Sequence, residues 1–168
     1  MHIQDFHLPR YHEIPDVGLY LDQTVKYINR FLTPLHCPEI TASMVSNYVK
    51  KDYIRNPEKK QYSAEQVAYL LFISIAKLAL PMEHIARLFA MQRSTYSSQV
   101  AYDYFCMEFE NVLQYVFHLK GQMDTVGETT SQTKTMLRSA IIAIANILYL
   151  RREFESQAPQ QVPPPERK

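Results

Sequence analysis

Glycine is nearly absent from this chain, and that scarcity limits the folds that the chain can adopt. Only Gly18, Gly121 and Gly127 occur among its 168 residues. Because left-handed turns favour glycine, a protein built from many short strands and tight turns would need more of them. Several segments instead place apolar residues at spacings of three, four and seven, the period of an amphipathic helix. The sequence therefore predicts an all-α protein.

Proline and capping signals divide the chain into segments. Pro9 and Pro15 mark an extended N-terminal arm over residues 1–19, and Pro34 stops the first helical pattern. Ser63 and Gln66 form a capping box ahead of an apolar run. We expect one domain over residues 20–93, a helical region over 94–157 and a disordered, proline-rich tail over 158–168. The expected helices lie at about 20–33, 42–53, 64–80, 82–91, 96–120 and 132–156.

Residues 41–53 read as a short amphipathic helix with two different faces. Thr41 is a good N-cap, and Val45 and Tyr48 fall on the inner face. Small hydroxyls, an amide and a cation occupy the outer face, and these side chains suit the base edges and phosphates of a major groove. The outer-face residues are Ser43, Ser46, Asn47 and Lys50, with Asn47 expected to pair with adenine.

A basic segment follows this helix, and we expect it to be a small hairpin wing over residues 54–62 with Asn56-Pro57 as its turn. Five basic residues stand against two acidic ones between residues 41 and 62, a net charge of +3 in a chain of net charge +1. Positive charge concentrated beside a groove-reading helix is typical of a DNA-binding surface. The residues expected to contact phosphates are Lys51, Arg55, Lys59 and Lys60, with Tyr62 at the base of the wing.

The two C-terminal helices differ from the rest of the chain. The last one is apolar on almost every face from Met136 to Leu150, so it must be enclosed by other elements. Two helices alone cannot enclose it. We therefore expect it to pack on the first half of the chain or to form a homodimer interface. The bulky and aromatic residues of 96–154 also permit a pocket for a small hydrophobic effector.

The sequence offers no motif for catalysis or for a metal site. It has no glycine-rich phosphate loop, no His-Glu-x-x-His and no Gly-x-Ser-x-Gly, so we expect no enzyme. Cys37, Cys106 and the histidines lack metal-ligand spacing, and we expect neither metal nor cofactor. The longest apolar run, Ala140 to Leu150, is too short for a membrane span of about 20 residues. Without an apolar signal-peptide core, a cytoplasmic protein with no membrane contact is expected.

Several short motifs resemble a bacterial family, domain of unknown function 1836, over roughly residues 5–95. They occur in order along the chain. They are Leu8-Pro9-Arg10-Tyr11, Ile14-Pro15, Leu19-Tyr20-Leu21-Asp22-Gln23, the segment from Ile40 to Lys50, Pro57 and Lys60-Gln61-Tyr62. This resemblance implies a family but no defined activity.

A second resemblance is to the MerR-type DNA-binding domain. It is carried by Asn47-Tyr-Val-Lys-Lys51, Lys60-Gln-Tyr-Ser63, the helix from Ala64 to Leu71, and Leu80-Pro-Met-Glu-His-Ile85. It implies a winged helix-turn-helix head at 20–93 and dimerisation through a long C-terminal helix. The chain departs from that pattern in having a longer linker before the recognition helix and two C-terminal helices in place of one.

Together these features predict a transcriptional regulator that binds double-stranded DNA as a homodimer. Two alternatives stay open at this point. One is an all-α adaptor that uses the basic segment for an acidic protein partner. The other is a small-molecule sensor that acts through the C-terminal helices.

Overall fold

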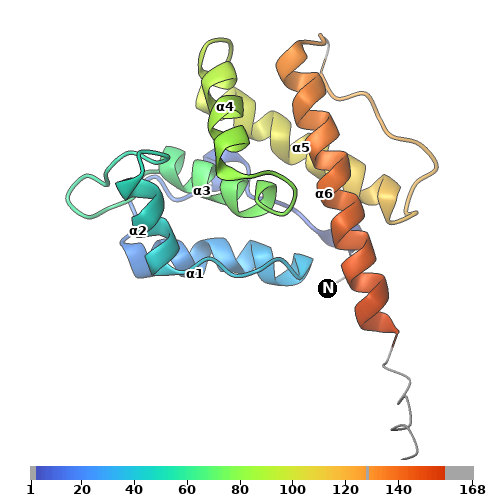
Figure 1. Ribbon diagram of the computed structural model, residues 1–168, viewed down its shortest axis with the longest axis horizontal. Coiled ribbons are helices and arrows are strands. Elements are labelled where there is room, and N and C mark those ends of the chain that lie inside the picture. The colour runs from blue at the N-terminus through green and yellow to red at the C-terminus, as the bar shows by residue number, and fades with distance from the viewer. Residues whose placement is uncertain (1–2, 128, 158–168) are drawn as a thin grey trace, which may run out of the picture.

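The most deeply buried helix of the structure is α3 (Ala64–Ala76), of whose thirteen residues eight are buried. The structure is a computed structural model and describes residues 3–127 and 129–157. The expected capping box starts α3, because the Ser63 hydroxyl accepts from the Gln66 N–H and Gln66 Oε1 accepts from the Ser63 N–H. Four helices pack around it (Figure 1): α1 (Leu21–Leu32), α4 (Met82–Arg93), α5 (Ser98–Val116) and α6 (Gln132–Ser156).

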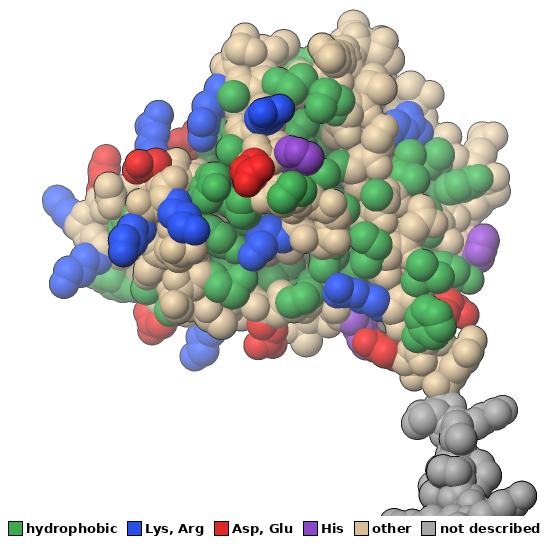
Figure 2. All heavy atoms as spheres, viewed as in Figure 1, with side chains coloured by type: hydrophobic (Ala, Val, Ile, Leu, Met, Phe, Trp, Pro, Cys, Tyr) green, Lys and Arg blue, Asp and Glu red, His purple; other side chains and the backbone are tan. Residues whose placement is uncertain are grey.

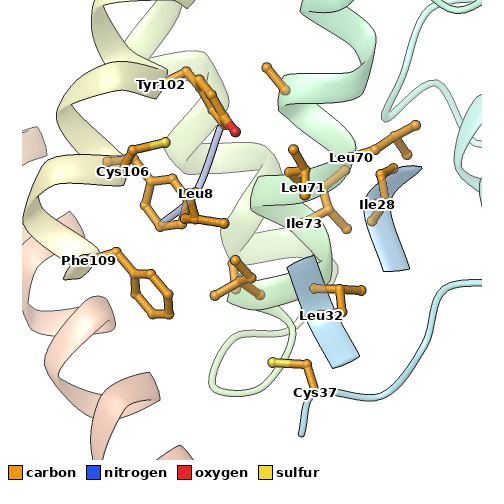
Figure 3. Packing of buried hydrophobic residues seen from close by; sticks show 14 of the residues in the cluster. Leu8, Ile28, Leu32, Cys37, Leu70, Leu71, Ile73, Tyr102, Cys106 and Phe109 are labelled. Atoms are coloured by element: carbon orange, nitrogen blue, oxygen red, sulfur yellow. The ribbon is translucent and has the colours of Figure 1, made fainter. Parts of the chain in front are cut away.

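The N-terminal arm, which includes the 3-10 turns η1 (Ile3–Asp5) and η2 (Tyr11–Glu13), is fixed to α5. Leu8 is fully buried and lies between the labelled side chains of α5 and those of α3 (Figure 3). The Arg10 guanidinium donates to both carboxylate oxygens of Glu110, at 2.8 and 2.7 Å. Glu110 also accepts from the Leu8 N–H at 2.8 Å. The Leu-Pro-Arg-Tyr motif is therefore the anchor of the arm.

Helices α5 and α6 pack along one another and share an apolar seam of Phe109, Leu113, Ile141, Ile144 and Leu148, all of them buried. The link between them is fastened by Asn111, whose side chain both donates to and accepts from the Asp124 backbone, at 2.9 and 3.0 Å. α6 also reaches α3 and α4, so the two halves of the chain share one continuous core.

The prediction of an all-α protein is confirmed for the described residues, which form six α-helices and no strand. Each expected helix has a counterpart, but three end several residues earlier than predicted, among them α3, which ends at Ala76 and not near residue 80. α2 (Ala42–Lys50) stops short of residue 53 because Asp52 adopts a left-handed conformation, with φ of 60°. α5 stops at Val116 because His118 does the same, with φ of 58°.

The prediction of a hairpin wing over residues 54–62 was wrong. Residues 51–62, called the basic loop below, contain no strand and only two isolated bridges, Glu58 with Gln61 and Tyr62 with Leu19. Three facts prevent a ladder. Pro57 has no N–H to donate, the Arg55 carbonyl accepts from the Gln66 side chain, and both backbone groups of Tyr62 bond to Leu19 instead.

Helix α6 packs on α3 and α4 in the first half of the chain, which is one of the two outcomes expected for it, but only one of its faces is enclosed within the protomer. Ile141, Ile144 and Leu148 are buried, whereas Met136, Leu150 and Phe154 are exposed. The predicted disordered tail, 158–168, lies outside the described residues. Among those described, no helix combines the length and apolar character needed to span a membrane.

Glu108 on α5 is the one fully buried acidic side chain among the described residues. Its Oε1 lies 3.0 Å from Arg138 Nε on α6, but within the described part of the chain neither carboxylate oxygen has a well-formed hydrogen bond. Burial raises the pKa of Glu108, and the nearby Arg138 opposes that rise only in part.

We expect Glu108→Gln to gain stability over the wild type as pH rises. The folded protein holds the Glu108 proton to a higher pH than the unfolded chain does. The wild type therefore loses stability as the pH rises above the ordinary pKa of glutamate. The Glu108→Gln variant, which carries no titratable group at this position, does not. Urea unfolding between about pH 4.5 and pH 8 measures this difference. A free-energy difference between the two proteins that is constant over this range would contradict the assignment.

Candidate nucleic-acid interface

Helix α2 is fixed to α1 at its N-terminus. The Thr41 hydroxyl accepts from the Met44 N–H at 3.2 Å, so Thr41 is the N-cap that the sequence predicted. The Asn29 side chain of α1 bonds to both backbone groups of Ile40, at 3.0 and 2.9 Å, immediately before α2 begins. Val45 and Tyr48 are buried, as their spacing predicted.

The opposite face of α2 is open to solvent. Ser43, Ser46, Asn47 and Lys50 are all exposed. The N-terminal arm therefore does not cover them. The helix therefore presents a continuous surface of two hydroxyls, one amide and one ammonium group.

The C-terminal half of α2 is supported by a contact that sequence reasoning missed. Lys77, at the end of α3, donates from Nζ to the buried Tyr48 hydroxyl at 2.8 Å, and its ammonium lies 5.3 Å from the Tyr48 ring centroid. Lys77 thus holds the inner face of α2 against α3. No local sequence pattern predicts this pairing, because only the tertiary fold brings the two residues together.

The basic loop turns at Lys59 and Lys60, not at the predicted Asn56-Pro57. Both lysines have positive φ, 47° and 64°, and the Gln61 N–H donates to the Glu58 carbonyl at 2.8 Å. This is the geometry of a type I′ turn, for which Asn-Gly is the favoured pair. Two lysines occupy it at a cost in backbone strain, and both side chains point into solvent.

The loop is anchored at both ends, so its lysines are carried on a fixed frame. Gln66 Nε2 donates to the Arg55 carbonyl at 2.9 Å. The Tyr62 N–H donates to the Leu19 carbonyl at 2.7 Å, and the Leu19 N–H returns a bond of 3.0 Å to Tyr62. Gly18 permits this approach, since it has φ of 82° and a Cβ there would lie 3.0 Å from Gln61 Cβ. Sequence reasoning missed the anchoring roles of Gln66 and Leu19.

Positive charge gathers over these elements. Lys50, Lys51, Arg55, Lys59 and Lys60 are exposed, and within residues 3–127 and 129–157 no carboxylate lies within 4.0 Å of their charged groups. Figure 2 shows the basic side chains clustered on the side of the molecule formed by α2 and the basic loop, with fewer acidic ones among them. Unpaired surface cations are available to bind phosphate.

Tyr62 differs from the other predicted contact residues. Its side chain is 4 % exposed, and burial raises the pKa of its hydroxyl. The ring therefore packs in the core at the base of the loop and does not face outward. The remaining nine predicted residues, from Thr41 to Lys60, are exposed.

A pocket of about 130 Å³ lies between α3, α4, α5 and α6. The sequence placed an effector pocket between the two C-terminal helices, but Tyr69 and Phe72 of α3 and Phe89 of α4 form much of its wall. As for metal ligands, the described residues bring no three His, Cys, Asp or Glu side chains together. Cys37 and Cys106 are buried, which raises the pKa of each thiol to about 12.

The fold and this surface define an all-α protein with an anchored cationic helix-and-loop face. The model of the family described as Domain of unknown function (DUF1836) matches residues 9–105, more than half of the chain. The chain belongs to this family. The matched segment runs from the arm into α5 and so includes α2, the basic loop and all of α3. Searches of curated proteins and of solved structures gave no match, and the MerR-type resemblance stays a prediction.

Replacing Lys59-Lys60 by Asn-Gly is expected to stabilise the protein. The new pair adopts the left-handed conformation readily, which should add about 1 kcal/mol and raise the Tm by about 2–4 °C. Differential scanning calorimetry measures the change. The matched control is Lys59→Ala with Lys60→Ala, which removes the same two charges but keeps side chains that strain the turn. An equal rise in both variants would show that charge repulsion, not backbone strain, was relieved.

Proposed function

We propose that this protein is a cytoplasmic transcriptional regulator that binds double-stranded DNA as a homodimer. The observation that carries the proposal is the open polar face of α2 beside an anchored loop of unpaired cations. The head is a helix-turn-helix of α1 and α2, related to the MerR type, in which a single tight turn takes the place of a hairpin wing.

In this proposal α2 enters the major groove with its outer face toward the bases. The Asn47 amide pairs with N6 and N7 of an adenine, and Ser43, Ser46 and Lys50 contact neighbouring base edges or phosphates. Thr41 lies at the helix N-terminus, where backbone N–H groups approach a phosphate. The hydrogen bonds made by Asn29 and Lys77 keep α2 from tilting when it binds DNA.

The basic loop binds the sugar-phosphate backbone beside the groove. Lys59 and Lys60 extend from the turn, and Lys51 and Arg55 lie on the segment leading to it. Because Arg55 and Tyr62 are fixed by backbone hydrogen bonds, the loop loses little conformational entropy on binding. Its contacts set register and affinity, and α2 supplies specificity.

The exposed face of α6 supports a homodimer. Met136, Ala143 and Leu150 recur at intervals of seven, as do Ser139 and Asn146, and all five are exposed. None is charged, although Arg151, Arg152 and Glu153 lie nearby on the same helix. A seven-residue repeat of uncharged side chains is the pattern of a helix that pairs with a copy of itself. α6 lies across the molecule from the basic loop (Figure 1), which leaves both heads free.

Selection from random duplexes with the purified full-length protein tests DNA binding, and we expect a two-fold symmetric site to be enriched. On that site, Lys59→Ala with Lys60→Ala should weaken binding and reduce the slope of log K against log salt by about one to two. Fluorescence anisotropy over a range of salt concentrations measures both.

Two controls separate this result from general charge effects. Lys26→Ala with Arg87→Ala removes two exposed cations outside the surface and should leave the slope unchanged. Asp52→Gly relieves a left-handed residue and removes a negative charge beside Lys51, so it should tighten binding. Failure to enrich any duplex would refute DNA binding and favour an acidic protein partner for the same cations.

Dimerisation through α6 is tested by Ala143→Glu with Leu150→Glu. Both positions are exposed in the protomer, so the fold should persist by circular dichroism while like charges meet in the seam. Sedimentation equilibrium should show a dimer for the wild type and a monomer for this variant. The control, Ala90→Glu with Gln99→Glu, adds the same charge at exposed sites elsewhere and should stay dimeric. A monomeric wild type would contradict the proposal.

A further inference from the structure

The pocket between the two halves of the protein has the shape of a ligand site. Its volume is about 130 Å³. Helices α3 and α4 supply one part of its wall, and α5 and the first two turns of α6 supply the rest. It is partly open to solvent, since its wall residue Val100 is 56 % exposed, and it lies away from α2 and the basic loop, which take no part in its lining.

The pocket is more than a packing defect. A hollow that no side chain fills gives up dispersion contacts between its walls. Larger apolar residues could have filled it, yet the chain places alanine at two wall positions, Ala68 on α3 and Ala101 on α5. An engineered apolar cavity of about 150 Å³ binds benzene, so this volume holds one small ring, and the open side leaves room for a second.

The wall is aromatic and ordered. The rings of Tyr69 and Phe89 meet edge to face at 4.6 Å between centroids, and those of Phe72 and Phe105 do so at 4.9 Å. Such a wall offers both ring faces and ring edges to a guest, and aromatic guests use both.

Several polar groups at the pocket bond to one another, but the buried hydroxyl of Tyr102, another wall residue, has no hydrogen-bond partner within the described part of the chain. The Tyr69 hydroxyl donates to Gln92 Oε1 at 2.9 Å, and Gln92 Nε2 donates to the Tyr96 carbonyl at 2.6 Å. The wall is otherwise mostly apolar, so a charged ligand would lose more hydration than the wall returns.

Two cations beside the wall rings disfavour a positively charged ligand. The Arg93 guanidinium lies 5.4 Å from the Tyr69 ring centroid, and Lys134 Nζ lies 4.9 Å from that of Tyr104. These positive charges already occupy the rings and repel a cationic guest. The pocket thus differs from an aromatic cage for ammonium groups.

We propose that this pocket binds a small neutral aromatic molecule of one or two rings. Binding is held by ring contacts with Tyr69, Phe72, Phe89 and Phe105. It does not depend on DNA, so it stands or fails separately from the function proposed above.

Isothermal titration calorimetry and thermal melts of the full chain test the proposal with indole and with a matched pair, benzyl alcohol and benzylammonium. The members of the pair have nearly the same shape and differ in charge. We expect indole and benzyl alcohol to bind with Kd on the order of 0.1–1 mM. At ten times that concentration they should raise the Tm by about 3–5 °C. Benzylammonium should bind at least tenfold more weakly.

Two variants locate the site. Ala101→Leu fills the pocket from α5 and Leu137→Phe fills it from α6, and each should abolish the indole-dependent rise in Tm. The control Ala90→Leu changes an exposed alanine on α4 that is absent from the wall, so it should bind indole like the wild type. Circular dichroism identifies any variant that fails to fold. If one of the two filling variants fails to fold, the other one tests the location of the site. No binding by the wild type, equal binding of the charged probe, or full affinity in a folded filling variant would each overturn the proposal.

Discussion

The enclosure of α3 on every side is the constraint on which the rest of the structure depends. Val67, Leu70, Leu71, Ile73 and Ile75 are fully buried, so the helix can neither slide nor rotate without exposing apolar surface. Two other residues of α3 and the residue that caps its C-terminus depend on this rigid position. Gln66 holds the basic loop, Lys77 holds α2, and Tyr69 forms part of the pocket wall. The cationic face of α2 and the basic loop, and the wall of the pocket, are therefore both attached to the most buried helix of the protein.

Local signals in the sequence predicted the helices and the open face of α2 well. The capping box at Ser63, the N-cap at Thr41 and the exposure of Asn47 follow from rules that act over four or seven residues. The loop was predicted less well because its geometry depends on distant partners. Tyr62 pairs with Leu19 and Arg55 with Gln66, and no spacing rule connects either pair. For the same reason the predicted pocket was placed between the C-terminal helices alone, whereas α3 and α4 also form its wall.

Glycine scarcity predicted the helical fold but misjudged the turns. Asp52, Lys59, Lys60 and His118 adopt left-handed conformations that glycine would take with less strain. At the end of α5, His118 regains some of that energy through an edge contact with Tyr149. Lys59 and Lys60 have no comparable compensation among the described contacts of their side chains, which lie in solvent. No contact among the described residues offsets the backbone strain of these two adjacent lysines. A role for the loop in binding would explain why the strain is kept.

Helix α6 connects the pocket to the DNA-binding head proposed above. Lys134 and Leu137 of its first turns line the pocket. At its other end Glu155 pairs with His36 Nδ1 at 2.6 Å, in the segment that joins α1 to α2. A ligand shifts DNA affinity only if it binds one arrangement of these elements better than another. A rigid helix that contacts the pocket at one end and the helix-turn-helix linker at the other is a suitable carrier for such a shift. Because the exposed face of α6 is also the proposed dimer seam, any tilt caused by a ligand would change the spacing of the two heads.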